Sequence, residues 1–177
     1  MKLVFVRHTS VDVPAGVSYG QADVPLRATF PLEASVTRAC LSPYGRFDAA
    51  YTSPLTRCTR LAQYCGFADA ERDARLLEID MGDWEMQRFD TIADPRVEQW
   101  QNNKFFTAAT RGESLADQYD RVRDFLEQLL TLDFKQVVIF THGGVIACAR
   151  IFSGEISVEE ALEREVDYGG VFEMELE

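Results

Sequence analysis

The sequence predicts an α/β fold in which helices cover both faces of a mostly parallel β-sheet. Two short, continuous runs of apolar and β-branched residues, at positions 3–6 and 136–141, have the pattern of strands buried on both faces. Amphipathic helical patterns lie between them, and residues 171–176 alternate as an antiparallel edge strand would. These observations favour a three-layer α/β/α sandwich with right-handed crossovers.

The first half of the chain adds two helices and a weaker strand. Residues 31–41 have a helical pattern, and residues 49–52 form a third candidate strand. Ser53 is a candidate N-cap with Pro54 at the first helical position, and apolar residues then recur at spacings of three and four until Gly66 ends the run.

The second half begins with a long helix. Ser114 and Asp117 resemble a capping box, and the helical pattern continues to about residue 132. A helix over residues 144–152 and a short one near residue 160 follow. Residues 9–29 and 81–112 lack clear periodicity, and such long irregular stretches are usually functional or contain minor elements.

Composition narrows the class of protein. The 177 residues are 46% hydrophobic, which fits one compact domain spanning residues 1–177. Lys and Arg number 18 against 29 Asp and Glu, and a net charge of −11 argues against a general nucleic-acid binder. No apolar stretch is long enough to span a membrane, and Arg7 interrupts the N-terminal run before a signal peptide could form. We therefore expect a cytoplasmic protein, and its oligomeric state is left open by the sequence.

Metal and disulfide chemistry are not expected. The chain has two histidines and four cysteines, without a Cys-x-x-Cys pair or histidines at helical spacing. These are too few ligands for most soft-metal sites. The cysteines lie in apolar or helical context, so we expect buried, reduced thiols.

Both histidines, His8 and His142, come directly after a predicted buried strand. If these strands are parallel neighbours, the two imidazoles face the same crevice. Each histidine alone could simply bind backbone at a strand end, but the equivalent positions of the pair favour a site. Gly143 and Gly144 follow His142 and open a helix, whose amides can bind an anion.

Arginines complete the predicted anion site. Arg7 precedes His8, and Arg57 lies near the start of the helix after the third candidate strand. A planar guanidinium suits phosphate oxygens, although the spacing alone favours a solvated helix residue for Arg57.

Five motifs follow one another along residues 3–146. They are Val-Phe-Val-Arg7-His8, Tyr51-Thr-Ser53-Pro54-Leu-Thr-Arg57, Leu77-Glu78-Ile-Asp-Met-Gly82-Asp-Trp84-Glu85, Gly112-Glu113-Ser114 and Phe140-Thr-His142-Gly143-Gly144. These motifs, in this order, resemble those of the histidine phosphatase superfamily, which has the phosphoglycerate mutase-like fold. Within that superfamily the segment over residues 19–26 is most similar to the alpha-ribazole phosphatase branch, which dephosphorylates a precursor of the cobalamin nucleotide loop.

The resemblance implies a phosphomonoesterase for a small organic phosphate that works without a metal or other cofactor. His8 would be the nucleophile that is phosphorylated, while Arg7, Arg57 and His142 would hold the phosphoryl oxygens. Glu78 would protonate the leaving alkoxide and then activate water. The two nearby guanidiniums should lower the pKa of His8, which keeps the nucleophile neutral near pH 7.

Some assignments have competitors. Glu85 is a second carboxylate near Glu78, and Glu113 and Ser114 are expected to cap the long helix. Thr9 and Met86 stand where glycine is usual in the family, Leu61 where threonine is usual, and Val13-Pro14 where an asparagine is often found. A mutase that uses the same phosphohistidine is an alternative, though such relatives are generally longer. A non-catalytic relative that binds a phosphorylated ligand is a second alternative.

Overall fold

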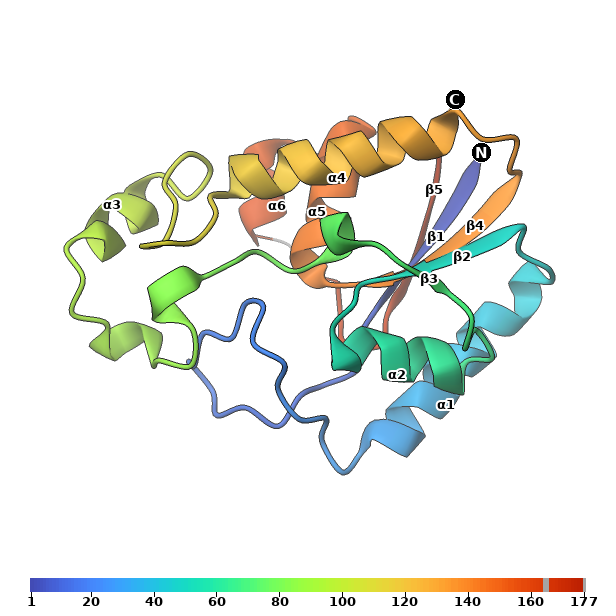
Figure 1. Cartoon of the computed structure of the whole chain (residues 1–177), viewed down its shortest axis with the longest axis horizontal. Coiled ribbons are helices and arrows are strands. Elements are labelled where there is room, and N and C mark those ends of the chain that lie inside the picture. The colour runs from blue at the N-terminus through green and yellow to red at the C-terminus, as the bar shows by residue number, and fades with distance from the viewer. Residues whose placement is uncertain (164–165, 177) are drawn as a thin grey trace.

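A five-stranded sheet forms the middle layer of the computed structural model, which describes residues 1–163 and 166–176 (Figure 1). The strand order is β3-β2-β4-β1-β5, and every neighbouring pair is parallel except β1 and β5. A mostly parallel sheet with an antiparallel edge strand, as predicted, is therefore confirmed. The strands are β1 (Lys2–Arg7), β2 (Ala49–Thr52), β3 (Glu71–Arg72), β4 (Gln136–Thr141) and β5 (Val171–Glu175).

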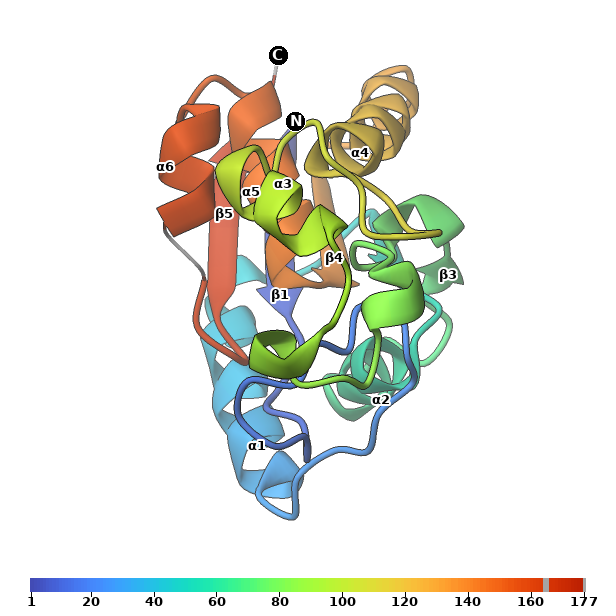
Figure 2. The same ribbon diagram turned by 90° about the vertical axis from the view of Figure 1, so that its left-hand side faces the viewer.

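Helices cover both faces of the sheet (Figures 1 and 2). One face carries α4 (Leu115–Leu130) and α5 (Gly143–Phe152), with α6 (Val158–Glu163) beside α5. The other carries α1 (Phe30–Leu41) and α2 (Thr56–Tyr64). The remaining helix, α3 (Arg96–Asn102), lies in the long segment between β3 and α4.

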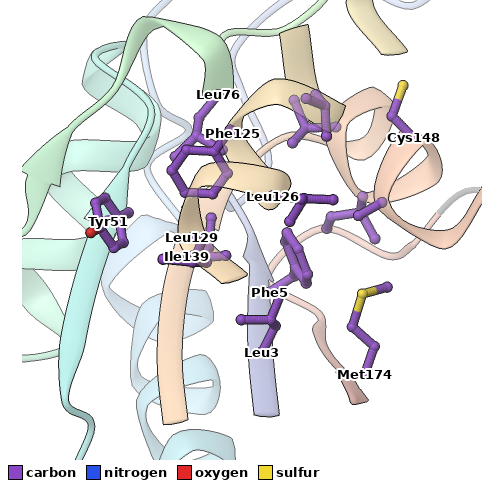
Figure 3. Packing of buried hydrophobic residues seen from close by; sticks show 14 of the residues in the cluster. Leu3, Phe5, Tyr51, Leu76, Phe125, Leu126, Leu129, Ile139, Cys148 and Met174 are labelled. Carbon is purple, nitrogen blue, oxygen red and sulfur yellow. The ribbon is translucent and has the colours of Figure 1, made fainter. Parts of the chain in front are cut away.

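The alternation of side chains along the central strands divides the core into two layers. Leu3, Phe5 and Ile139 point towards α4 and α5, where they meet Phe125 and Leu126 (Figure 3). The intervening strand residues pack against α1 and α2 on the other side. Because apolar residues occupy both faces, β1 and β4 read as continuous apolar runs.

Several local predictions need correction. Helix α2 begins at Thr56, so Ser53 is not its N-cap and Pro54 is not its first residue. The cap comes instead from a distant loop, where the Asp23 carboxylate accepts hydrogen bonds from the Thr56 amide and hydroxyl at 2.9 and 2.5 Å. Cys40 is exposed and Cys65 only half-buried, whereas Cys58 and Cys148 are buried as predicted, and all four are free thiols. Strand β3 and helix α3 were not predicted, because each is too short to show a period.

The capping box predicted for α4 is confirmed. Ser114 and Asp117 exchange the expected hydrogen bonds at its first turn. In the described part of the chain no helix is long and apolar enough to cross a membrane.

Candidate active site

The carboxyl ends of β1 and β4 bring the two histidines together. The strands are parallel neighbours with Arg7 paired to Thr141, so His8 and His142 both follow at the same sheet edge. Their ring centroids are 5.1 Å apart in an edge-to-face arrangement. The strands are thus the parallel neighbours that the prediction required, and the two imidazoles lie side by side, both buried, at this edge of the sheet.

His8 has a defined tautomer. Its Nδ1 lies 2.8 Å from the Thr9 carbonyl, which can only accept, so Nδ1 carries the proton and Nε2 keeps a lone pair. The side chain is buried, and burial lowers its pKa from 6.5 to about 3. Arg57 is the second cause and Arg7 a smaller one, while the Thr9 bond opposes them. The predicted direction is confirmed, although burial is a larger cause of the lowered pKa than either arginine.

His142 is fully buried and both its ring nitrogens have protein partners. Arg57 Nε donates to Nδ1 at 3.3 Å, so the ring proton lies on Nε2, which donates to Ser53 Oγ at 2.8 Å. Burial, followed by the charge of Arg57, holds the pKa of His142 well below its usual value. The ring is thus neutral, and in this arrangement it orients Arg57.

Arg57 is a buried cation. Its guanidinium is fully inaccessible to solvent and donates to the carbonyls of Gly20 and Ala22 at 2.6 and 2.8 Å. Within residues 1–163 and 166–176 it makes no ion pair with a carboxylate. A buried charge normally has a counter-ion, so this arrangement is suited to an anionic ligand.

Two tyrosines cover the histidines and arginines. The Tyr168 ring lies 4.1 Å from the Arg7 guanidinium and 5.5 Å from the His8 ring. Tyr19 lies 5.2 Å from the Arg57 guanidinium. The two hydroxyls are hydrogen-bonded at 2.9 Å, joining segments 149 residues apart. We call this pair the tyrosine bridge.

Glu78 lies at the edge of the cluster, at the start of α5. Its Oε2 accepts from the Gly144 amide at 3.2 Å, and its Oε1 accepts from the Ile79 amide and from Gln118 Nε2, both at 2.9 Å. A Cβ on Gly144 would lie 2.3 Å from Glu78 Oε1, so only glycine allows this approach. Gly143 is less restricted, since its Cβ would lie 3.3 Å from Arg7 Cζ, a tight contact that a small shift of the side chain relieves.

Glu85, the competing carboxylate, is bound to backbone amides. One of its oxygens accepts from the backbone amides of Gln21 and Met81 at 2.7 and 3.2 Å. Glu113 is likewise engaged, by Arg121 and by the Asp80 amide. Neither lines the cavity described next, whereas Glu78 does.

A cavity of about 250 Å³ opens beside Glu78 and Arg7. Most of its wall is apolar, and Lys104, Gln118 and the two glycines of α5 add polar groups. Part of the segment over residues 81–112 therefore helps to enclose the site, through Trp100 and Lys104. The lining residues are Arg7, Glu78, Ile79, Trp100, Lys104, Leu115, Gln118, Gly143, Gly144, Ala147 and Ala161.

Reasoning from sequence missed Tyr168, Asp23 and Gln118. Gln118 offered a signal, because it is a polar residue on the apolar face of a strongly amphipathic helix. Tyr168 and Asp23 offered none, since their roles depend on contacts between distant segments. No group of three or more His, Cys, Asp or Glu side chains that could hold a metal ion occurs among the described residues.

Comparisons with known proteins agree with this geometry. The family model for the histidine phosphatase superfamily (branch 1) matches residues 3–177. A probable phosphoglycerate mutase from Serratia proteamaculans is 31% identical over 158 residues, covering 84% of this chain and 72% of that protein. Phosphoserine phosphatase 1 from Hydrogenobacter thermophilus is 29% identical over 150 residues, covering 80% and 71%.

One solved structure extends the similarity across the whole chain. The alpha-ribazole phosphatase from Shigella flexneri superposes with a TM-score of 0.89 and covers 100% of this chain and 91% of that one. The two sequences are 23% identical, so this similarity concerns the fold.

Proposed function

The chain belongs to the histidine phosphatase superfamily, and from that premise we propose that it hydrolyses a small phosphomonoester through a phosphohistidine formed on His8. The observation that carries the proposal is the buried guanidinium of Arg57, which has no carboxylate partner among the described residues and lies beside a neutral His8. Phosphate esters are anions whose transfer needs fixed positive donors and a free nucleophile.

In the first step the Nε2 lone pair of His8 attacks phosphorus, and the bond to the ester oxygen breaks. Arg7 and Arg57 balance the charge on the phosphoryl oxygens, and Gly143 at the start of α5 lies against Arg7. Glu78, as the acid, gives its proton to the departing alkoxide. A contact from His142 to a phosphoryl oxygen requires its ring to exchange its bond to Arg57 or to Ser53.

In the second step a water molecule attacks the phosphohistidine. Glu78, now a carboxylate, takes a proton from the water as the P–N bond breaks, and phosphate leaves. His8 regains its lone pair and Glu78 its proton, so the cycle closes. The low pKa of His8 supports this scheme because the ring carries no competing proton near pH 7.

For the leaving group we propose an alcohol with a large apolar part, and the leading candidate for the substrate is alpha-ribazole 5′-phosphate. The cavity beside Glu78 is walled by Ile79, Leu115 and Trp100, which suits an aromatic nucleoside. Lys104, whose ammonium lies 4.9 Å from the Trp100 ring centroid, favours a second class, a phosphorylated hydroxy acid. Phosphoserine and 3-phosphoglycerate are suitable probes of that class.

The test compares wild type and His8→Ala on p-nitrophenyl phosphate without added metal. We expect wild-type turnover, loss of activity in the variant and an acid-labile phosphoprotein in rapidly quenched wild type. No turnover by folded wild type would exclude the phosphatase. Specificity constants for alpha-ribazole 5′-phosphate, phosphoserine and 3-phosphoglycerate then rank the leaving groups, and isomerisation of 3-phosphoglycerate without phosphate release would indicate a mutase.

A further inference from the structure

Gln118, on α4, is a fully buried polar residue in contact with Glu78. Its Nε2 donates to Glu78 Oε1 at 2.9 Å. Its Oε1 is buried and accepts no hydrogen bond from any residue in ranges 1–163 and 166–176. Buried polar atoms in native proteins are almost always paired, so an exception beside a candidate acid needs an explanation.

The other neighbours of the Glu78 carboxyl can serve only one of its forms. Ile79 and Gly144 contact it through backbone amides, which donate and cannot accept. They stabilise a carboxylate but provide no hydrogen-bond acceptor for the O–H of a carboxylic acid. The proposed reaction needs both forms, the acid in the first step and the carboxylate in the second. The Gln118 amide has a donor and an acceptor on one carbon.

We propose that Gln118 is a positioning residue that holds Glu78 in both protonation states. Nε2 donates to the carboxylate, and after a half-turn of the side-chain amide, Oε1 accepts from the carboxylic acid. Oε1 has no partner in the described part of the chain, so a half-turn of the amide breaks only the hydrogen bond from Nε2 to Glu78. The hydrogen bond from the Glu78 carboxylic acid to Oε1 replaces it. The unpaired oxygen is thus the feature that leaves the amide free to turn.

Gly144 provides the space for this movement. A Cβ at that position would lie 2.8 Å from Gln118 Oε1 and 2.9 Å from its Nε2. Any side chain there would hold the amide in one orientation or displace it. The absence of a side chain at Gly144 therefore leaves room both for the Gln118 amide to turn and for the Glu78 carboxyl to approach.

Several charged and titratable groups surround Gln118 and Glu78, and a substitution at Gln118 leaves all of them in the protein. Arg121 of α4 donates to the Glu78 carbonyl at 3.0 Å and pairs with Glu113 at 2.9 Å. Arg7 and Lys104 line the same cavity. Burial, and then the nearby charge of Glu78, raises the pKa of the Cys148 thiol of α5. A change seen on altering Gln118 alone is therefore due to the amide.

The inference rests on the proposed function, and its test uses Gln118→Met, which keeps the side-chain length and removes both polar atoms. Gln128→Met is the matched control, because it makes the same change on an exposed part of the same helix. Propyl phosphate releases an alkoxide, a poor leaving group that needs a proton from Glu78. p-Nitrophenyl phosphate releases a stable phenolate that scarcely needs one. We expect Gln118→Met to lower kcat for propyl phosphate by roughly 10- to 100-fold, a part of the roughly 10²- to 10⁴-fold that general acid catalysis contributes, and KM to change little.

For p-nitrophenyl phosphate the expected loss is about 3-fold or less, since little acid assistance is needed. The basic limb of the kcat profile should also move to higher pH, because a charged acceptor loses more than a neutral donor when the amide is removed. Gln118→Glu, a second variant of the same shape, should move that limb further, since two adjacent carboxyls share one proton.

Equal losses on both substrates with an unmoved limb would overturn the proposal and leave Gln118 a purely structural residue. The same losses in Gln128→Met would also overturn it. A carboxyl-carbon NMR titration, with the signal assigned from its loss in Glu78→Gln, provides a readout without turnover, and an unchanged midpoint in Gln118→Met refutes the proposal. Failure of wild type to hydrolyse any ester refutes the phosphatase instead, so the two failures are distinguishable.

Discussion

The two buried histidines should make the protein less stable as the pH falls from 8 to 5.5. Burial and then Arg57 lower the pKa of His8 to about 3, and the same causes, in the same order, hold the pKa of His142 well below 6.5. In the unfolded chain both side chains take up protons near their ordinary pKa of about 6.5. Below that pH the unfolded state binds more protons than the folded one. The stabilisation is complete above the unfolded pKa and is lost as the pH falls towards the folded values.

The size of the effect follows from proton binding. At pH 5.5, protonation stabilises the unfolded chain by RT ln 11, or about 1.4 kcal/mol, for each histidine that stays neutral when folded. His8 and His142 together therefore lower the free energy of unfolding by about 2.8 kcal/mol relative to pH 8. Carboxylates add little in this window, because they titrate nearer pH 4.

Urea unfolding at pH 8 and pH 5.5 measures the loss directly. We expect wild type to lose about 2.8 kcal/mol, and His8→Asn and His142→Asn to lose about 1.4 kcal/mol each, since each variant retains one buried histidine. The comparison is between two pH values for the same variant, so any direct effect of the substitution on packing cancels. If both variants lost as much as wild type, the assignment of neutral, buried histidines would be wrong.

Three further outcomes are expected at the site. Glu78→Gln should lower turnover of an alkyl phosphate by roughly 10²- to 10⁴-fold while phosphate still binds, because the general acid is lost. Glu85→Gln should mainly lower the free energy of unfolding, by about 1–3 kcal/mol. Steady-state kinetics and urea unfolding measure the two effects, and the reverse pattern would make Glu85 the acid. Gly144→Ala places a Cβ 2.3 Å from Glu78 Oε1, so turnover should fall at least about tenfold, and near-normal kcat would contradict the required close approach. Tyr168→Phe removes the hydroxyl bond of the tyrosine bridge and should speed modification of His8 by diethyl pyrocarbonate, while an unchanged rate would show that the bridge does not limit access.

Periodicity and position made the central part of the fold predictable. Strands β1 and β4 are buried on both faces, so their continuous apolar runs stand out, and each is followed by one of only two histidines. The capping box of α4 is local in the same sense, because its two partners are three residues apart. Features fixed by neighbours in the chain, or by burial on both faces of an element, leave a signal in the sequence.

The parts that could not be predicted depend on distant pairs. Asp23 caps α2 from 33 residues away, and Tyr19 meets Tyr168 across 149 residues. Neither pair has a spacing that a single sequence can reveal. Gln118 is intermediate, since its place on an apolar face marks it as unusual without identifying Glu78 as its partner.

The net charge of −11 and the proposed anionic substrate are reconciled by where the protein places its neutral and charged groups. Arg57 and Arg7 are buried and hold two positive charges at the carboxyl ends of β1 and β4. The same burial keeps both histidines neutral, so the positive charge at this end of the sheet comes from the arginines and not from the imidazoles. Protonating the histidines would add charge and remove the nucleophile together. Burial of the site is therefore what allows an acidic protein to bind a small anion and keep an imidazole ready to attack it.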